Sequence, residues 1–371
     1  MSLKRKKQTR ILSFILSMVL VLFVGCSKNS QDTEQAKNDT DAEIMEEPYD
    51  ETEFLMGTYV SLRIYDEGKE DVLEDAFARV EELEDKLTVN EPDSDNVKDS
   101  EIHEANEAAG ESAVSVSEDV YPLLEAAAEY SAEEKSGFDY TIGPITDLWR
   151  IGFDDARVPE QEEIDEALPL VDPTLVELDE KEQSVFLKEE DMQLDLGAIA
   201  KGYIADEVIK LLKEEGVTTA IVDLGGNVVV LGDSPTRDEG GWNVGIQDPS
   251  SQRGEYVGAI NVKDKSIVTS GIYERYIEED GKIYHHLMDP ETGYPFENDL
   301  ASVTIISEES IDGDALSTVV FAHGLEDGLD YVNNLEDVEA VFISKEDDLY
   351  TSDGITEEFD LTNEDFNWVN E

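Results

Sequence analysis

The sequence predicts an α+β fold in which helices are mixed with largely antiparallel sheets. Strand-like segments follow one another in runs and do not alternate strictly with helices, as they would in a doubly wound sheet. Short turns join consecutive strands directly, for example at Asp280-Gly281. Neither a Gly-x-Gly-x-x-Gly loop after a strand nor a Walker loop occurs, so the two commonest nucleotide-binding loops of α/β folds are absent from the sequence.

Residues 1–26 have the pattern of a lipoprotein signal peptide. Basic residues precede an apolar run from Ile11 to Val24, which is too short for a membrane span and suits a signal peptide. The run ends at the lipobox-like segment 22–26, so we expect lipidation of Cys26, the one cysteine, in preference to a buried thiol or a plain cleaved signal. This interpretation predicts an extracytoplasmic protein that is lipid-anchored to the cell membrane.

The chain is strongly acidic, with 27 Lys and Arg against 91 Asp and Glu and a net charge of −64. Such a surface repels phosphate backbones and excludes nucleic acid as a partner. The acidic residues are spread through every segment, so we interpret them as a solvated surface suited to a saline or alkaline habitat.

Residues 27–50 are polar and acidic and predict a disordered linker, followed by a globular domain over residues 51–371. The domain begins with a predicted strand at 56–65 and a helix whose apolar positions run from Val72 to Leu87. Residues 90–110 are turn-rich. Ser117 is the expected N-cap of a helix that ends before Gly137, and residues 154–171 are expected to form an acidic insertion or loop.

The second half of the domain is richer in strands. A helix is predicted from about residue 198 to 215, and another from about 312 to Gly324 with a further helix after it. The predicted strands lie at 219–224, 227–231, 242–247, 256–262, 267–270 and 302–306, with hairpins around Asp280-Gly281 and over 338–351.

Four short motifs carry the candidate chemistry: Met56-Gly57-Thr58 and the segments 195–203, 289–295 and 314–318. Segment 195–203 opens a helix, whose free N–H groups and positive dipole end attract anions, and Lys201 lies on its first turn. By themselves, Lys201 could be a solvated helix residue and Asp195 only a helix cap. The two glycines after the strand at 219–224 would let backbone N–H groups approach a pyrophosphate, although such a pair is more often a simple turn.

Asp314 and Thr318 lie four residues apart on a predicted helix and share one face. A carboxylate and a hydroxyl are hard oxygen ligands suited to Mg²⁺, and Ser317 is on the adjacent edge. Taken alone, the pair could equally be a helix cap and a hydroxyl bonded within its own helix. His285 and His286 precede the 289–295 turn, which favours a functional role for them.

Together these motifs resemble the ApbE family of FAD:protein FMN transferases, formerly described as thiamine-biosynthesis lipoproteins. The resemblance also includes segments 138–144 and 223–227, Ser270-Gly271 with Arg275-Tyr276, and His286, and it runs in order from about residue 54 to 354. It implies a T-fold-like α+β architecture with FAD in a cleft between two lobes. It implies FAD contacts from Met56, Gly137, Phe138, Asp139, Asp195, Lys201 and the backbone around Met288. It implies a metal bound by the main-chain oxygen of Ala198 with Asp314 and Thr318, and with Ser317 close by.

The resemblance further implies a Mg²⁺-dependent transfer of FMN from FAD to a Thr or Ser hydroxyl of an acceptor flavoprotein, within an Asp/Ser-x-x-Thr-Ser/Ala-Thr sequence, with release of AMP. Our hypothesis gives catalytic roles to Asp314 at the metal, Lys201 at the phosphates and His286 as the base. The next choice for the base is Asp289 or an Asp near the metal. Two alternatives stay open: an FAD pyrophosphatase that yields FMN and AMP, and a non-catalytic flavin-binding lipoprotein. The Asp314/Thr318 pair argues against pure binding, since storage needs no such ligands.

Overall fold

The computed structural model describes residues 43–89, 100–133, 135–355 and 358–370. The predicted signal peptide and the lipidation of Cys26 lie outside these residues. The helices are α1 (Val72–Leu87), α2 (Glu101–Glu107), α3 (Tyr121–Ser131), α4 (Gly143–Trp149), α5 (Gln161–Ala167), α6 (Ala200–Glu214) and α7 (Ser310–Val332), with 3₁₀ turns η1 (Leu168–Leu170) and η2 (Pro173–Leu175).

The strands are β1 (Ile44–Leu55), β2 (Thr58–Asp66), β3 (Val114–Ser115), β4 (Val176–Asp179), β5 (Ser184–Leu187), β6 (Ala220–Leu224), β7 (Asn227–Leu231), β8 (Trp242–Gln247), β9 (Tyr256–Val262), β10 (Lys265–Gly271), β11 (Tyr276–Glu279), β12 (Lys282–His285), β13 (Leu300–Ser307), β14 (Glu339–Ser344), β15 (Asp348–Thr351), β16 (Phe359–Leu361) and β17 (Asn367–Trp368).

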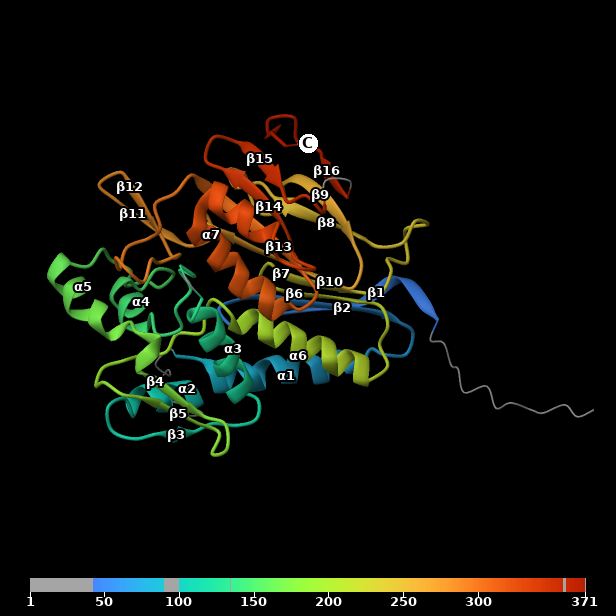
Figure 1. The fold of residues 1–371 in the computed structure, drawn as a ribbon. Helices are drawn as coiled ribbons and strands as arrows, with labels where there is room; N and C mark the ends of the chain where they lie inside the picture. The colour runs from blue at the N-terminus through green and yellow to red at the C-terminus, as the bar shows by residue number, and fades with distance from the viewer. Residues whose placement is uncertain (1–42, 90–99, 134, 356–357, 371) are drawn as a thin grey trace, which may run out of the picture. The chain divides into compact units, whose positions relative to one another are not determined.

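A nine-stranded sheet organises these elements in the order β1-β2-β6-β7-β10-β13-β14-β15-β17 (Figure 1). Each neighbouring pair is antiparallel except β15 and β17. The predicted α+β class with largely antiparallel sheets is therefore confirmed. The predicted bounds of β7, β8 and β9 agree with the structure, because each strand is a short segment rich in apolar residues between glycine or charged residues.

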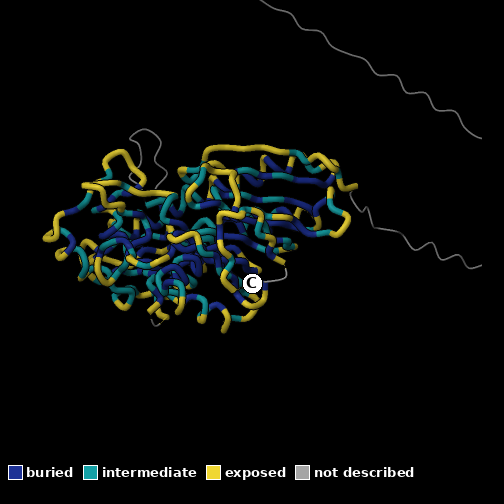
Figure 2. The backbone as a smooth tube through the Cα atoms, turned by 90° about the horizontal axis from the view of Figure 1, so that it is seen from above, coloured by how far each residue is buried: buried dark blue, intermediate teal, exposed yellow. Residues whose placement is uncertain are grey.

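Both faces of the large sheet are covered. Helices α1, α6 and α7 pack on one face through apolar side chains at helical spacing, such as Val80 and Leu83 of α1 and Val208 and Leu212 of α6. On the other face, the small sheet β16-β9-β8 contributes Trp242, which packs in one cluster with apolar residues of the large sheet. Figure 2 shows the buried residues along the interior of these layers and the exposed ones mainly in the connections.

A second group of elements contains the small sheet β3-β5-β4 and helices α2 to α5 (Figure 1). A separate apolar cluster joins Trp149 of α4 and Ile164 of α5 to Met288. The Trp149 indole N–H also donates to the Gly293 carbonyl at 2.8 Å, so this cluster ties α4 to the 289–295 turn.

Four turns and termini lie at one end of the large sheet. The Met56-Gly57 turn joins β1 to β2, and β2 pairs with β6 so that Val60 lies opposite Leu224, just before the Gly225-Gly226 turn. Because β6 runs antiparallel to the preceding helix α6, the N-terminus of α6 lies at the same end. The last residues of β10 extend past Asn227 at that edge. The antiparallel topology thus gathers most of the sequence motifs in one place.

Three predicted boundaries are wrong in the first half. Met56 and Gly57 are not in a strand but form a tight turn with φ of 52° and 68°, which suits the right-handed twist of the hairpin. Strand β1 begins at Ile44, inside the predicted linker 27–50, because pairing with β2 gives its backbone partners although most of its side chains are exposed. The N-cap of α3 is Val120 and not Ser117.

Two helices lie where loops were predicted. Helix α2 lies in the turn-rich segment 90–110, begins after the Ser100 cap and buries only Ile102 and Ala105. Helix α5 lies in the predicted loop 154–171. It buries only Ile164, and a capping box at its start stabilises it in place of further apolar contacts. Such short helices have too few apolar positions to show a period. By contrast, the predicted break at Gly324 of α7 is confirmed by its φ of 74° and ψ of −170°.

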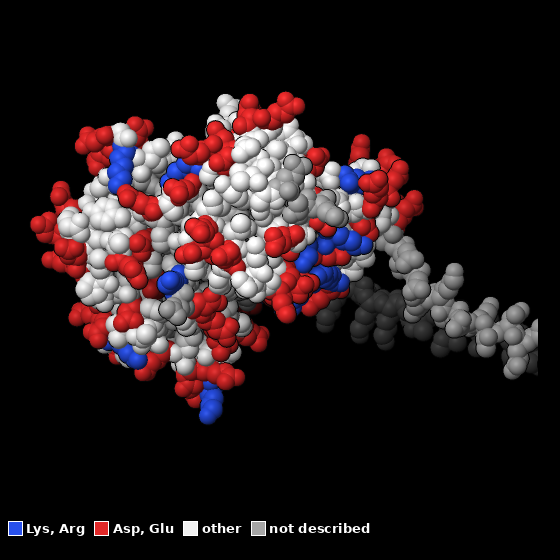
Figure 3. Space-filling model, turned by 45° about the horizontal axis from the view of Figure 1, so that its top comes forward, with Lys and Arg blue, Asp and Glu red and all other residues white. Residues whose placement is uncertain are grey.

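Acidic side chains are spread in groups over the face shown in Figure 3, with fewer Lys and Arg among them. They agree with the net charge of −64. Of the helices in the described ranges, none is both long and apolar enough to cross a membrane.

Candidate functional site

Two helix starts meet at the centre of the candidate site. The Lys201 ammonium, on the first turn of α6, lies 3.0 Å from Oδ1 and 3.4 Å from Oδ2 of Asp314 on α7. The Gly202 N–H donates to Asp314 Oδ2 at 2.9 Å. Asp314 is 4% exposed, so this carboxylate is held inside the protein by a cation and a backbone N–H. The fold thus brings together Lys201 and Asp314, which are 113 residues apart.

The Ala198 carbonyl and the Thr318 hydroxyl lie at the same junction with free hydrogen-bonding capacity. In a regular helix the Gly202 N–H would bond the carbonyl four residues earlier, which belongs to Ala198. Here that N–H goes to Asp314, and the Ala198 carbonyl has no hydrogen-bond partner among the described residues. Thr318 is one turn beyond Asp314 and half-buried, and within the same residues its hydroxyl is also unpaired. The Asp314 carboxylate, the Ala198 carbonyl and the Thr318 hydroxyl are thus three different kinds of oxygen that could bind a metal, at the starts of two helices.

Ser317 is differently engaged. Its hydroxyl donates to the Asp314 carbonyl at 2.7 Å and lies 2.7 Å from the Ser270 hydroxyl on β10. Since the single Ser317 proton goes to the carbonyl, Ser270 is the donor of the second bond. This chain fixes the Asp314 turn of α7 to the end of β10.

His286 faces the same region. Its Nδ1 lies 3.2 Å from the Arg275 carbonyl, which can only accept, so the neutral ring has its proton on Nδ1 and its lone pair on Nε2. The His286 ring is partly exposed but has protein on most sides. This desolvation, together with the charge of the Arg275 guanidinium, lowers the pKa of His286 to about 3. The positive charge of the Lys201 ammonium acts on the pKa of His286 in the same direction, as the smallest of these contributions.

The neighbouring His285 and Asp289 have structural environments. His285 is buried, its Nε2 lies 3.1 Å from the Phe296 carbonyl, and burial lowers its pKa to about 4. The Asp289 carboxylate accepts from the Glu291 N–H and the Thr292 hydroxyl, both at 2.9 Å, so it is used within its own turn. In His286 the ring nitrogen Nε2 has no hydrogen-bond partner among the described residues, which suits a base.

The segment 137–139 and Asp195 lie against each other. The Asp195 N–H donates to the Tyr140 carbonyl, and the Asp195 carboxylate accepts from Gly197 N–H at 2.8 Å and from the Thr146 hydroxyl at 2.7 Å. The Asp139 carboxylate accepts from both the N–H and the hydroxyl of Thr141, and burial raises its pKa. Both carboxylates therefore shape the loops that precede α4 and α6.

Phe138 and Gly137 have little free side-chain surface. Phe138 is 3% exposed, and its ring centroid is 6.0 Å from that of Tyr130. Gly137 has a φ of 64°, and a Cβ there would lie 2.2 Å from the Ala322 Cβ of α7, so only glycine fits. A ligand could contact this segment mainly through its backbone.

Met56 and Met288 lie in different surroundings. Met56 is half-buried, and its N–H donates to a Glu84 carboxylate oxygen on α1 at 2.8 Å, which fixes the turn. Met288 is buried in the α4/α5 cluster and bridges through its backbone to Pro295. The FAD contact through the backbone around Met288 stays a prediction.

Sequence reasoning missed three residues that shape the site: Glu84, Thr146 and Asp206. Their partners are 28, 49 and 104 residues away along the chain. Pairings of this length leave no local pattern, and a signal for them would require knowledge of the topology.

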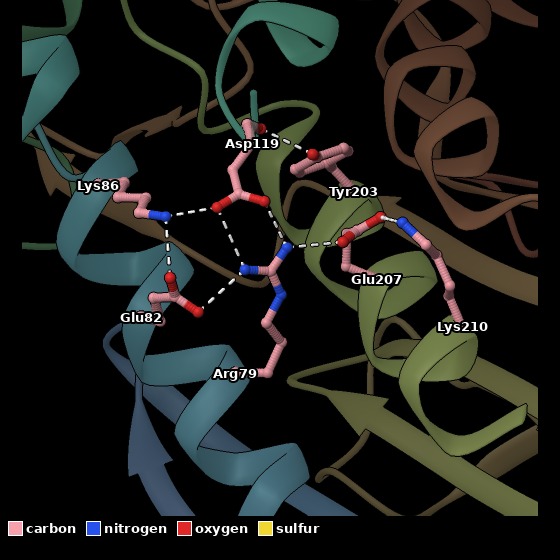
Figure 4. A network of polar contacts seen from close by, with 7 residues as sticks. All are labelled: Arg79, Glu82, Lys86, Asp119, Tyr203, Glu207 and Lys210. Carbon is pink, nitrogen blue, oxygen red and sulfur yellow. Dashed lines mark hydrogen bonds and ion pairs between the residues drawn. The ribbon is translucent and has the colours of Figure 1, made fainter. Parts of the chain in front are cut away.

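A denser set of charges joins α1 to α6 (Figure 4). Arg79 donates to carboxylates of Glu82, Asp119 and Glu207 at 2.6 to 3.2 Å. Lys86 joins the network through Asp119 and Glu82. The guanidinium of Arg79 lowers the pKa of Asp119 to about 2.

Comparison with known proteins places this geometry in a family. The ApbE family model matches residues 56–342, a range that includes all the residues described above for the site. An FAD:protein FMN transferase of Klebsiella pneumoniae is 40% identical over 304 residues, covering 82% of this chain and 92% of the relative. One of Treponema pallidum is 36% identical over 324 residues, covering 83% and 88%. The crystal structure of an ApbE protein of Thermotoga maritima matches with a TM-score of 0.75 at 28% identity, covering 84% of this chain and 99% of that one.

Proposed function

The chain belongs to the ApbE family, and from this premise we propose that it transfers FMN from FAD to a hydroxyl of an acceptor flavoprotein and releases AMP. Relatives named FAD:protein FMN transferase cover most of its length. The observation that carries the proposal is the Lys201–Asp314 pair at the N-terminus of α6, because it places a cation at the positive end of a helix dipole, where a pyrophosphate can bind.

We propose Mg²⁺ as the metal. The donor set fits, because the Asp314 carboxylate already attracts a cation and the Ala198 carbonyl and Thr318 hydroxyl are free hard oxygens at the same junction. The described ranges contain no cluster of three or more His, Cys, Asp or Glu side chains that could hold a metal. One carboxylate is consistent with Mg²⁺, which takes its other ligands from waters and substrate phosphates. When bound, it would neutralise the charge that develops on the pyrophosphate.

The chain's own residues then account for the reaction. An acceptor Thr or Ser oxygen forms a bond to the phosphorus on the FMN side of FAD, and the bond from that phosphorus to the bridging oxygen breaks, releasing AMP. Nε2 of His286 takes the hydroxyl proton. The Lys201 ammonium, whose hydrogen bonds among the described residues all go to Asp314, can turn toward the phosphates and stabilise their charge.

We further propose that the protein is lipid-anchored through Cys26 and works outside the cytoplasmic membrane on an acceptor with an Asp/Ser-x-x-Thr-Ser/Ala-Thr sequence. The support is the basic and apolar pattern of residues 1–26. Mass spectrometry of the protein from its host membrane tests the anchor, since a diacylated Cys26 at the mature N-terminus is expected and an intact residue 1 would contradict it.

The function is tested with the full-length chain in detergent, FAD, Mg²⁺ and a carrier protein that ends in Asp-x-x-Thr-Ala-Thr. We expect flavin fluorescence in the carrier band of a denaturing gel, with one AMP released per carrier labelled. The matched control replaces the last two Thr of the tag with Val, which keeps their shape but removes the hydroxyls.

The alternatives give other results. A pyrophosphatase would release AMP at the same rate with either tag and label neither. A flavin-binding protein would bind FAD and release no AMP. Either result would contradict the transferase.

A further inference from the structure

Helices α6 and α7 cap each other. The carboxylate of Asp206, on the second turn of α6, accepts the N–H of Ser310 and the N–H of Ile311 at the start of α7, each at 2.8 Å. In return, Asp314 of α7 accepts the N–H of Gly202 at the start of α6. Each helix thus satisfies the initial N–H groups of the other.

Neither helix provides its own side-chain cap. The N-cap residue of α6 is Ile199, which has no acceptor, and that of α7 is Glu309, whose side chain makes no capping bond. The first N–H groups of a helix have no partner within it and must find one elsewhere. The exchanged aspartates are these partners, so each helix start depends on the position of the other.

The two backbones approach closely because residue 202 is glycine. A Cβ at Gly202 would lie 2.2 Å from the Ser310 carbonyl oxygen and 2.7 Å from the Ile311 Cα. Both atoms belong to the backbone that Asp206 holds. The close approach and the two hydrogen bonds therefore fix the same pair of residues on α7.

The position of Asp206 at the contact with α7 costs desolvation free energy. Burial raises its pKa to about 6, against the two N–H groups that lower it, and the carboxylates of Glu309 and Asp312 raise it further. A carboxylate on an open surface would avoid this desolvation. Its location is explained by the contact with α7.

We propose that Asp206 is a positioning residue for the transfer reaction: it holds the first turn of α7 against α6, so that Asp314, Thr318 and the Ala198 carbonyl meet around one cation. This inference rests on the proposed function for the identity of the cation. This role differs from a general contribution to stability, because Asp206 acts only at the N-terminal end of α6, where the site lies.

The chain offers a matched control at the opposite end of α6. The buried Asp66 carboxylate also accepts two distant backbone N–H groups, those of Thr218 and Thr219, at 2.9 to 3.1 Å. These residues follow α6, about 20 Å from its start by the helical rise. Asp66→Asn thus removes the same kind of contact without touching the site.

The experiment compares wild type, Asp206→Asn and Asp66→Asn as full-length chains in detergent. Three quantities are measured: the Mg²⁺ concentration that gives half-maximal AMP release, the affinity for Mg²⁺ by calorimetric titration of the FAD-bound chain, and the affinity for FAD without metal. For Asp206→Asn we expect a loss of about ten-fold in both Mg²⁺ quantities, on the scale of a charge-assisted contact, and a change below about two-fold in FAD affinity.

Asp66→Asn is expected to lower the melting temperature and leave the Mg²⁺ quantities at the wild-type value. Asp206→Glu, which keeps the carboxylate, should recover part of the loss and serves as the second variant if Asp206→Asn does not fold. The proposal is overturned if Asp206→Asn binds Mg²⁺ like wild type, or if Asp66→Asn weakens Mg²⁺ equally. A wild type that releases no AMP but binds Mg²⁺ would instead count against the proposed function.

Discussion

Helix α6 has charged contacts in two places, and they are built differently. On its outer side, the guanidinium of Arg79 is surrounded by carboxylates that occupy its donors, and Glu207 of α6 is one of them (Figure 4). At its N-terminus, Lys201 contacts a single carboxylate, Asp314. Each place joins α6 to another helix through ion pairs.

The difference lies in what remains available to a ligand. In the Arg79 network the hydrogen bonds are closed within the protein, so the network can stabilise the α1–α6 contact but offers nothing to a substrate. At Lys201 the Ala198 carbonyl and the Thr318 hydroxyl are unpaired among the described residues, and the ammonium can exchange its partner. A rich network of charges is therefore a poor sign of a site, and an incompletely satisfied one is a better sign.

Replacing Asp314 with Ala should give the largest effect. We expect the rate of AMP release to fall by about 10³-fold or more, because the anionic ligand of the metal is lost. The folded state should survive, with a drop of a few degrees in melting temperature for the lost cap on Gly202. The rate is measured as steady-state AMP release over a series of Mg²⁺ concentrations. A variant that is still active and still Mg²⁺-dependent would refute the metal site.

Replacing His286 with Ala should lower the rate by about 10²-fold or more, as is typical for a general base. The pKa of His286 is lowered to about 3, so the free enzyme keeps the neutral, proton-accepting ring as pH falls below the usual value of 6.5. We therefore expect the wild-type kcat/KM for FAD to show no loss from this group between about pH 8 and 5. Full activity of the Ala variant across this range would exclude His286 as the base.

Replacing Arg79 with Met tests the second charged region, the network that joins α1 to α6. We expect the melting temperature to fall by about 3 to 6 °C, because the partly buried carboxylates of Asp119 and Glu207 lose their contacts with the guanidinium. The transfer rate should stay within about two-fold of wild type. Thermal unfolding and gel fluorescence are measured on the same sample, and a loss of rate comparable to that of the Asp314 variant would mean that the network takes part in the reaction.

Salt should have the smallest effect. Repulsion among 91 acidic residues against 27 basic ones outweighs the surface ion pairs, so screening should raise the melting temperature by a few degrees between about 0.05 and 1 M salt. A melting temperature that falls with salt would show that ion pairs such as those of Arg79 dominate stability, and would contradict adaptation to a saline habitat.

The sequence was sufficient for much of the fold and for the centre of the site. Strands such as 227–231 are short apolar runs between glycines, and Lys201 and Asp314 stand in motifs whose chemistry can be inferred from their residue types. Helix α5 was not predictable because it buries only Ile164. The contacts of Asp206 were not predictable either, since they depend on backbone N–H groups 104 and 105 residues away.

The most direct test of the central claim is a crystal structure of the chain with FAD and with Mn²⁺ in place of Mg²⁺, located by its anomalous scattering. The account predicts one Mn²⁺ peak bound by Asp314, Thr318 and the Ala198 carbonyl and touching the pyrophosphate, with the Lys201 ammonium moved from Asp314 to a phosphate oxygen. Mn²⁺ bound elsewhere, or an unchanged Lys201–Asp314 pair beside bound FAD, would contradict it.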